Sequence, residues 1–228
     1  MSRALRMLAP AAMPEGGVRV FRVSPVGPAT ATVLVGVWML ACAAVAWTGG
    51  LAEVNIPPAL AGWAAFWIGL YWLYVLNDLR KALKPAAWLA ALGPDGVYLN
   101  CRSYRNAGRG APMAHAAQVV LIPYASIAAA RAGVQSADAA GEPLRVVELR
   151  LAGADPSALE QCLAAARDGL AAGGPLGRML WWPSPVALHL DAVRVDFHAR
   201  RASRVLLFEL SRRGVPVESP PRPVPLGR

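Results

Sequence analysis

Charge is scarce in this chain, and two long stretches lack it altogether. Charged residues make up 16% of the sequence and hydrophobic residues 56%, whereas soluble domains average about 25% charged residues. No charged residue lies between Arg22 and Glu53, and none lies between Glu53 and Asp78. A helix needs about 20 apolar residues to cross the hydrocarbon core of a bilayer, so each stretch is long enough. The pattern predicts two transmembrane helices, within residues 29–51 and 58–76.

Two other interpretations of these stretches fit less well. A core helix of a soluble protein is usually shorter and keeps a polar stripe, which neither stretch has. A cleaved signal peptide would begin near residue 1, but the apolar run there is short and Pro10 interrupts it. Pro57 and Pro58 favour a helix start, since proline at the first helical position loses no hydrogen bond.

Cysteine and catalytic motifs are also sparse. Cys42, Cys101 and Cys162 are far apart and form no C-x-x-C pair, which argues against a zinc site. We expect them to be thiols in a reducing compartment. The sequence has no G-x-S-x-G, no H-E-x-x-H and no glycine-rich phosphate loop with lysine. We therefore expect a non-catalytic protein without a cofactor.

Positive charge is arranged asymmetrically around the two stretches. The loop at 51–57 holds Glu53 and no lysine or arginine. Basic flanks favour the cytoplasmic side, so both termini are expected in the cytoplasm and the two helices in the cytoplasmic membrane. The flanking basic residues are Arg3, Arg6, Arg19, Arg22, Arg80, Lys81 and Lys84.

Aromatic and small residues of the second stretch predict its contacts. Trp and Tyr favour the headgroup level of a membrane. Small residues four apart let another helix approach, either the first span or a second copy of the protein. The expected interface residues are Trp67, Tyr71, Trp72, Tyr74 and Trp88, together with Arg80, Lys81 and Lys84, and the expected packing residues are Ala61, Ala65 and Gly69.

From Trp88 onward the pattern predicts short strands separated by turns and two helices. LRVVELRL at 144–151 alternates apolar and polar residues and is the clearest strand. Asp155 can cap a helix over 156–172, and a last helix is expected over 201–213. The expected layout is a cytoplasmic segment at 1–28, a transmembrane hairpin at 29–84, a mostly β domain at 85–214 and a proline-rich tail at 215–228.

Two motifs after the hairpin point to a family. Asp95-Gly96 lies in LGPDGVYLN, and an Ile-Pro-Tyr-Ala-Ser-Ile run covers residues 122–127. Together they resemble bacterial pleckstrin-homology-like (PH-like) membrane proteins, in which a two-helix hairpin precedes a small β domain. The resemblance covers residues 87–151 and implies a PH-like α+β, mostly β, domain that binds or scaffolds and has no known reaction. The later strands and last helix do not map onto the family, and the helix at 156–172 is either its closing helix or an insertion.

Histidine and aspartate gather in two expected strands near residue 190. Residues two apart share one face of a strand, so paired strands would bring two His and two Asp together. Such nitrogen and oxygen ligands suit a metal ion. A solvated outer sheet face is the alternative that we favour, so no metal is expected. The cluster comprises His189, Asp191, Arg194, Asp196 and His198.

These observations favour a membrane-anchored binding or scaffold protein. A structural subunit of a membrane complex and a metal-dependent membrane enzyme are the alternatives. The net charge of +9 suits anionic lipid headgroups. The sequence has no basic stripe interleaved with aromatic residues, so nucleic acid is not an expected partner. The expected partners are the lipid bilayer and either an unidentified protein or a second copy of the chain.

Overall fold

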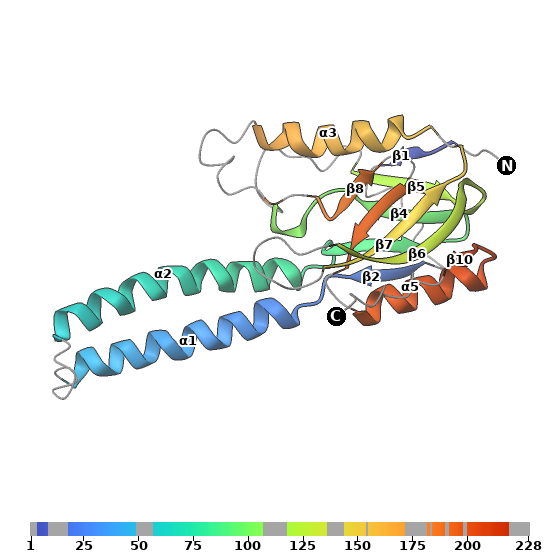
Figure 1. Ribbon diagram of the computed structural model, residues 1–228. Helices are drawn as coiled ribbons and strands as arrows, with labels where there is room; N and C mark the ends of the chain where they lie inside the picture. The colour runs from blue at the N-terminus through green and yellow to red at the C-terminus, as the bar shows by residue number, and fades with distance from the viewer. Residues whose placement is uncertain are drawn as a thin grey trace, which may run out of the picture. The chain divides into compact units, whose positions relative to one another are not determined.

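The chain folds into two compact units, a helical hairpin and a β domain (Figure 1). The hairpin comprises residues 24–87, and the domain comprises residues 1–23 and 88–228. The computed structural model describes residues 4–8, 18–48, 57–106, 118–135, 144–153, 155–171, 182, 184–189, 192–197 and 200–218.

The hairpin consists of α1 (Val26–Trp47) and α2 (Pro58–Ala82), which pack along each other. Pro57 has an extended backbone and Pro58 occupies the first turn of α2, as the sequence predicts. Both charge-free stretches thus form single helices. Each is long and apolar enough to cross a membrane.

The first sheet of the domain is antiparallel and takes strands from both sides of the hairpin. Its order is β1-β5-β4-β3-β2. Asp95 lies in the turn between β3 and β4, and Gly96 opens β4 where an added Cβ would lie 2.2 Å from the Ile122 carbonyl oxygen. The strands are β1 (Arg6–Leu8), β2 (Arg19–Arg22), β3 (Trp88–Leu92), β4 (Gly96–Asn100) and β5 (Val119–Pro123).

The N-terminal segment differs from the expected layout. Residues 1–28 were expected to precede the domain, but β1 pairs with β5 and β2 pairs with β3, where Arg22 lies opposite Trp88. The hairpin is therefore inserted between two neighbouring strands of one sheet. Strands of three and four residues are too short to show a period in the sequence, and their partners are distant along the chain.

The second sheet has the order β10-β6-β7-β9-β8. All pairs are antiparallel except β10 with β6, which is parallel. The strands are β6 (Ile127–Gln135), β7 (Leu144–Leu151), β8 (Val186–His189), β9 (Ala192–Asp196) and β10 (Val217–Glu218).

The first residues of the proline-rich tail belong to the domain and include the short strand β10. Gly214 has φ 81° and ends the last helix, and Val215 is buried. The Pro216 carbonyl accepts a hydrogen bond from the Ala130 N–H at 2.8 Å. Burial of Val215 and pairing of β10 with the edge of β6 hold this segment in place. Neither contact produces a periodic pattern of apolar residues that the sequence could show.

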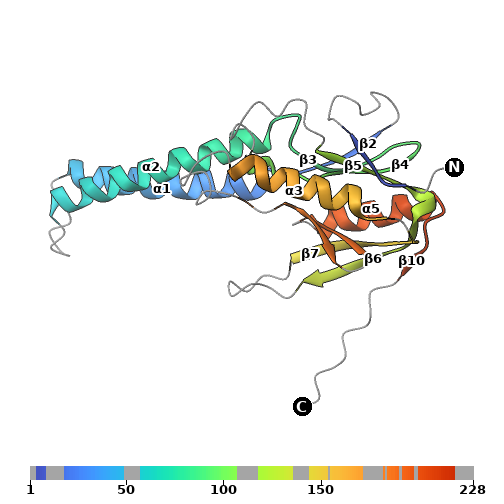
Figure 2. The same ribbon diagram turned by 90° about the horizontal axis from the view of Figure 1, so that it is seen from above.

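Two helices cover the sheets (Figure 2). Helix α3 (Ser157–Ala171) contacts β1, β5 and β8, and α5 (Arg200–Arg212) contacts β6, β7 and β10. Asp155 caps α3 by accepting hydrogen bonds from the backbone N–H and the hydroxyl of Ser157, at 2.9 and 2.8 Å. Both helices agree with the predicted ranges to within about two residues, the usual uncertainty of helix ends.

One hydrophobic core joins the two sheets and both helices. Burial of each large aliphatic side chain stabilises the fold by about 1.5–3 kcal/mol. Because members come from both sheets, the sheets pack face to face. The largest fully buried side chains include Leu92, Leu99, Ile122, Leu149, Leu159, Leu206 and Leu210.

Candidate functional site

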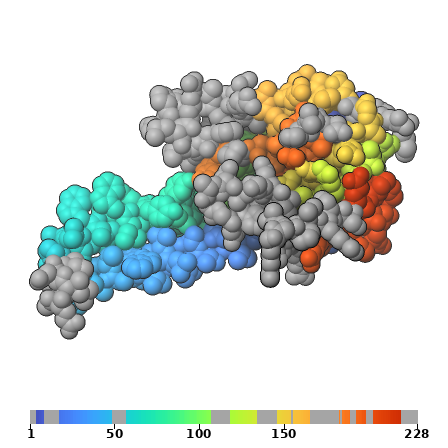
Figure 3. All heavy atoms as spheres, in the orientation of Figure 1, coloured from blue at the N-terminus to red at the C-terminus, as the bar shows by residue number. Residues whose placement is uncertain are grey.

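The outer surface of the hairpin is apolar. Thr32 is the only buried residue of α1, and its hydroxyl donates to the Pro28 carbonyl at 2.8 Å. The atoms of both helices lie open on the face drawn in Figure 3. A soluble monomer rarely exposes a contiguous apolar surface of this length. The exposed large side chains include Val33, Leu34, Val37, Trp38, Leu40, Leu60, Trp63, Phe66, Trp67, Leu70, Tyr71 and Leu73.

A tryptophan joins the two helices of the hairpin. The Trp72 Nε1–H donates to the Thr32 carbonyl of α1 at 3.0 Å. The indole lies over Gly36, where an added Cβ would lie 3.0 Å from Nε1. Trp72, which the sequence analysis assigned to a membrane interface, thus makes an interhelical hydrogen bond. Glycine at position 36 provides the space for it.

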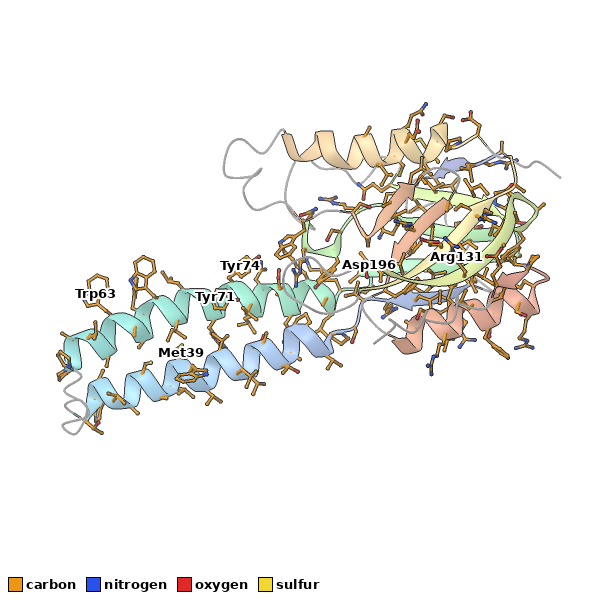
Figure 4. All side chains as sticks on the ribbon, in the orientation of Figure 1. Met39, Trp63, Tyr71, Tyr74, Arg131 and Asp196 are labelled. Carbon is orange, nitrogen blue, oxygen red and sulfur yellow. The ribbon has the colours of Figure 1, made fainter. Side chains whose placement is uncertain are left out.

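The small residues expected to form a packing ridge lie at different depths. Ala61 is buried, Ala65 is half-buried, and an added Cβ on Gly69 would lie 3.5 Å from the Met39 sulfur of α1. Met39 points toward α2 (Figure 4). At Gly69, then, the neighbouring helix is α1 of the same chain.

Aromatic rings line another face of α2. Phe66 packs edge-on against Trp63 and Trp67, with ring centroids 6.2 and 5.5 Å apart. Tyr71 stacks on Tyr74 at 6.2 Å. Trp63 points away from α1 (Figure 4). These ring contacts run along α2 and give no membrane depth, so the predicted interface positions, which include Trp67, Tyr71 and Tyr74, stay a prediction.

The basic residues after the apolar part of α2 divide into two environments. Arg80 and Lys84 are exposed, whereas Lys81 is buried. Asp78 is also buried and lies three positions before Lys81, so the two opposite charges share one side of the helix. Trp88 belongs to β3 of the domain and is half-buried.

The proposed histidine and aspartate cluster falls mostly outside the described residues. His189 ends β8, but its side chain and the whole of Asp191 and His198 lie outside the description. Asp196 is half-buried on β9, opposite Val146 of β7 (Figure 4). Within the described part of the chain, no group of three or more His, Cys, Asp or Glu could hold a metal ion. The structure therefore tests neither the metal site nor the solvated sheet face that we favour.

The fifth member of that cluster, Arg194, belongs to an ion-pair row across the second sheet. Glu148 of β7 lies between Arg131 of β6 and Arg194 of β9. Its carboxylate oxygens lie 2.5 Å from Arg131 Nε and 2.6 Å from Arg194 Nε, and its side chain is 9% exposed. Burial alone would raise the pKa of Glu148, but the hydrogen bond from Arg131 and the two guanidinium charges lower it. The alternation of LRVVELRL puts Glu148 on the polar face of β7. The sequence does not show which arginines lie opposite Glu148, because they belong to other strands.

The Ile-Pro-Tyr motif connects the strand turn to the end of α5. The Tyr124 hydroxyl donates to the Gly93 carbonyl at 2.8 Å, and Arg213 donates to the same carbonyl at 2.5 Å and to the Tyr124 oxygen at 2.8 Å. Burial raises the pKa of Tyr124, against the opposing charge of Arg213. The motif residue therefore has a structural role.

Two cysteines meet inside the domain. Cys101 follows β4 and Cys162 lies on α3, and both are buried thiols outside any disulfide bond. The hydrogen bond with Cys162, together with burial, raises the pKa of Cys101 well above its ordinary value. The same hydrogen bond lowers the pKa of Cys162, against the effect of its burial. Both side chains belong to the shared hydrophobic core, so the pair acts as core packing.

The 3₁₀ turn η3 (Tyr104–Asn106), which follows β4, carries an arginine–tryptophan contact that the sequence did not predict. The Arg105 guanidinium lies 3.9 Å from the centre of the Trp182 ring. Asn106, in the same turn, makes two hydrogen bonds to the Trp182 backbone. The sequence shows an aromatic and a basic residue side by side at Tyr104 and Arg105, but it does not show that Arg105 and Trp182 would come into contact.

Comparison with known proteins finds no family model, no curated protein and no solved structure that matches this chain.

Proposed function

We propose that this protein is a membrane-anchored, non-catalytic scaffold whose hairpin spans the bilayer and presents the β domain at the cytoplasmic face. The observation that carries the proposal is the exposed apolar surface of α1 and α2. The core helix of a soluble protein would bury such side chains, yet Trp38 and Trp67 are 67% and 61% exposed. Lipid is the solvent in which this surface is stable.

The sheet topology supports placing both ends of the hairpin on one side of the membrane. Arg22 at the end of β2 pairs with Trp88 at the start of β3. Neighbouring paired strands cannot lie on opposite sides of a bilayer. The basic flanks, which include Arg80 and Lys84, favour the cytoplasm for that side.

The binding role is supported by the architecture of the domain. Two sheets share a core closed by α3 and α5, and the Asp95-Gly96 turn and the Ile-Pro-Tyr motif lie at strand connections. We assign the domain to the PH-like class on this basis and expect it to hold a protein or a lipid headgroup.

A structural subunit of a membrane complex is the second candidate. Trp63, Phe66 and Trp67 form an exposed aromatic group on α2, and Trp67 lies near the middle of the charge-free stretch. An indole N–H in hydrocarbon is unfavourable without an acceptor, and a neighbouring subunit can supply one.

Membrane fractionation and co-purification test the proposal. We expect the full-length protein to stay in the membrane pellet after an alkaline carbonate wash, and a reporter fused to either terminus to be active only in the cytoplasm. Recovery in the supernatant would refute membrane insertion. Purification from mild detergent should retain a lipid or protein partner, and recovery of the chain alone without lipid preference would refute the scaffold role.

A further inference from the structure

One end of the first sheet collects arginine and tryptophan. Arg22 ends β2 and lies opposite Trp88, the first residue of β3. Asn100 ends β4, and its Nδ2 donates to the Trp88 carbonyl at 3.0 Å. Because β2, β3 and β4 are successive neighbours, these residues lie at the same end of the sheet.

The segment after β4 continues this surface. The Arg102 backbone N–H donates to Asn100 Oδ1 at 3.1 Å, and its guanidinium donates to the Asn106 carbonyl at 2.8 Å. Asn106 Nδ2 donates to the Trp182 carbonyl at 2.8 Å, and Asn106 Oδ1 accepts from the Trp182 N–H at 3.2 Å. The Arg105 guanidinium covers the Trp182 ring. An unbroken series of contacts therefore runs from β3 to Trp182.

We call this surface the basic rim. It carries three positive charges, and none of its members is acidic. Arg22 is exposed and the other members are half-buried. Arginine binds phosphate through two parallel hydrogen bonds, and tryptophan favours the headgroup level of a bilayer. The rim consists of Arg22, Trp88, Arg102, Arg105 and Trp182.

Chain length limits how far the rim can be from the ends of the hairpin. Val26 begins α1 four positions after Arg22, which allows at most about 14 Å of extended chain. Trp88 follows Ala82, the end of α2, by six positions, or at most about 22 Å. If the hairpin spans the membrane, both tethers start near the headgroups, whose layer is about 5–7 Å deep. The rim is then held within reach of phosphate groups whatever the orientation of the domain.

We propose that the basic rim binds the headgroups of anionic phospholipids in the membrane that the hairpin crosses. The inference rests on the proposed function, because the tether brings the rim to the membrane only if the hairpin spans it. Each arginine near an anionic surface strengthens association about fivefold. Binding by the rim would orient the domain on the membrane and leave the opposite end of the sheets for a partner.

The test compares two full-length variants that lose the same charge in different places. The rim variant carries Arg22→Gln, Arg102→Gln and Arg105→Gln. The control variant carries Arg150→Gln, Arg204→Gln and Arg212→Gln, which change exposed residues on β7 and α5. Each protein is equilibrated in detergent with equal phosphatidylglycerol and phosphatidylcholine, washed, and analysed for retained lipid by mass spectrometry.

The wild type and the control variant should retain phosphatidylglycerol in preference to phosphatidylcholine. The rim variant should show a phosphatidylglycerol-to-phosphatidylcholine ratio lower by about 125-fold, since three fivefold contributions are removed. An unchanged ratio in the rim variant, or an equal loss in the control, would overturn the inference. Arg102 also makes hydrogen bonds to Asn100 and Asn106, so its replacement could disturb the local fold. A second rim variant therefore carries only Arg22→Gln and Arg105→Gln. Its ratio of phosphatidylglycerol to phosphatidylcholine should fall about 25-fold.

Membrane fractionation separates this inference from the proposed function. The rim variant should still remain in the carbonate-washed pellet, because α1 and α2 are unchanged. Wild-type protein in the supernatant would refute the membrane anchor itself. Wild-type protein in the pellet, with the same lipid ratio as the rim variant, would refute the rim alone.

Discussion

The hairpin and the domain use the same residue types in opposite ways. Leu40 on α1 is 64% exposed, whereas Leu149 on β7 is fully buried. The domain pairs its charges, as Glu148 does, and the apolar part of the hairpin has none to pair. The domain buries its large apolar side chains in a shared core, and the hairpin leaves most of its own exposed. The proposed membrane anchor accounts for this difference, because lipid would cover the exposed side chains.

Replacing the hairpin by a tight turn gives the largest expected effect. Because Arg22 pairs with Trp88, putting Asn-Gly in place of residues 24–87 leaves a three-residue loop of Val23, Asn and Gly, which should join β2 to β3 as a hairpin. We expect this variant to move from the membrane pellet to the supernatant and to keep its β circular dichroism. A variant that remains in the pellet after the carbonate wash would show that the domain itself carries the anchor.

Two leucine-to-alanine substitutions compare the domain with the hairpin. Leu149→Ala should lower the free energy of unfolding of the domain by about 2–5 kcal/mol, because it leaves a cavity in the shared core. Leu40→Ala should change it by less than about 0.5 kcal/mol, because the side chain contacts no core. Chemical unfolding in detergent, followed by circular dichroism, measures both. Equal losses would contradict the division into two units.

Glu148 tests the charge pairing of the domain. Glu148→Gln should cost about 1–3 kcal/mol at neutral pH, because the carboxylate is buried between two guanidinium groups. The folded-state pKa of Glu148 lies below its ordinary value, so the stabilisation is present above about pH 4.3 and is lost as the pH falls through the folded-state pKa. Urea unfolding at a series of pH values should show a smaller loss of stability in acid for the variant than for the wild type.

The exposed Glu160 on α3 supplies the control for this variant. Glu160→Gln removes the same charge and should change stability at neutral pH by less than about 0.5 kcal/mol. If the two variants lose equal stability, the effect comes from net charge, and the ion-pair row contributes nothing specific.

Local patterns in the sequence predicted most of the fold. Absence of charge located α1 and α2, and alternation located β7, because each signal lies within one element. The short strands β1 and β2 were not predicted, because each is stabilised by a partner strand that is distant along the chain. The Arg105–Trp182 contact escaped for the same reason, because it joins two loops 77 positions apart. The predicted Asp191 and His198 lie outside the described residues, so the structure does not test that part of the cluster.

The smallest expected effect concerns the hydrogen bond that Trp72 makes between the helices of the hairpin. Trp72→Phe removes the N–H that donates to Thr32 and should weaken the hairpin by about 0.6–1.7 kcal/mol, the range for interhelical hydrogen bonds in membranes. Trp38→Phe is the control, because Trp38 is exposed on α1. Steric trapping or unfolding in mixed micelles measures both. A larger loss for Trp38→Phe would indicate that α1 docks against another protein through its exposed face, and the hairpin surface would then be an interface with a partner instead of lipid.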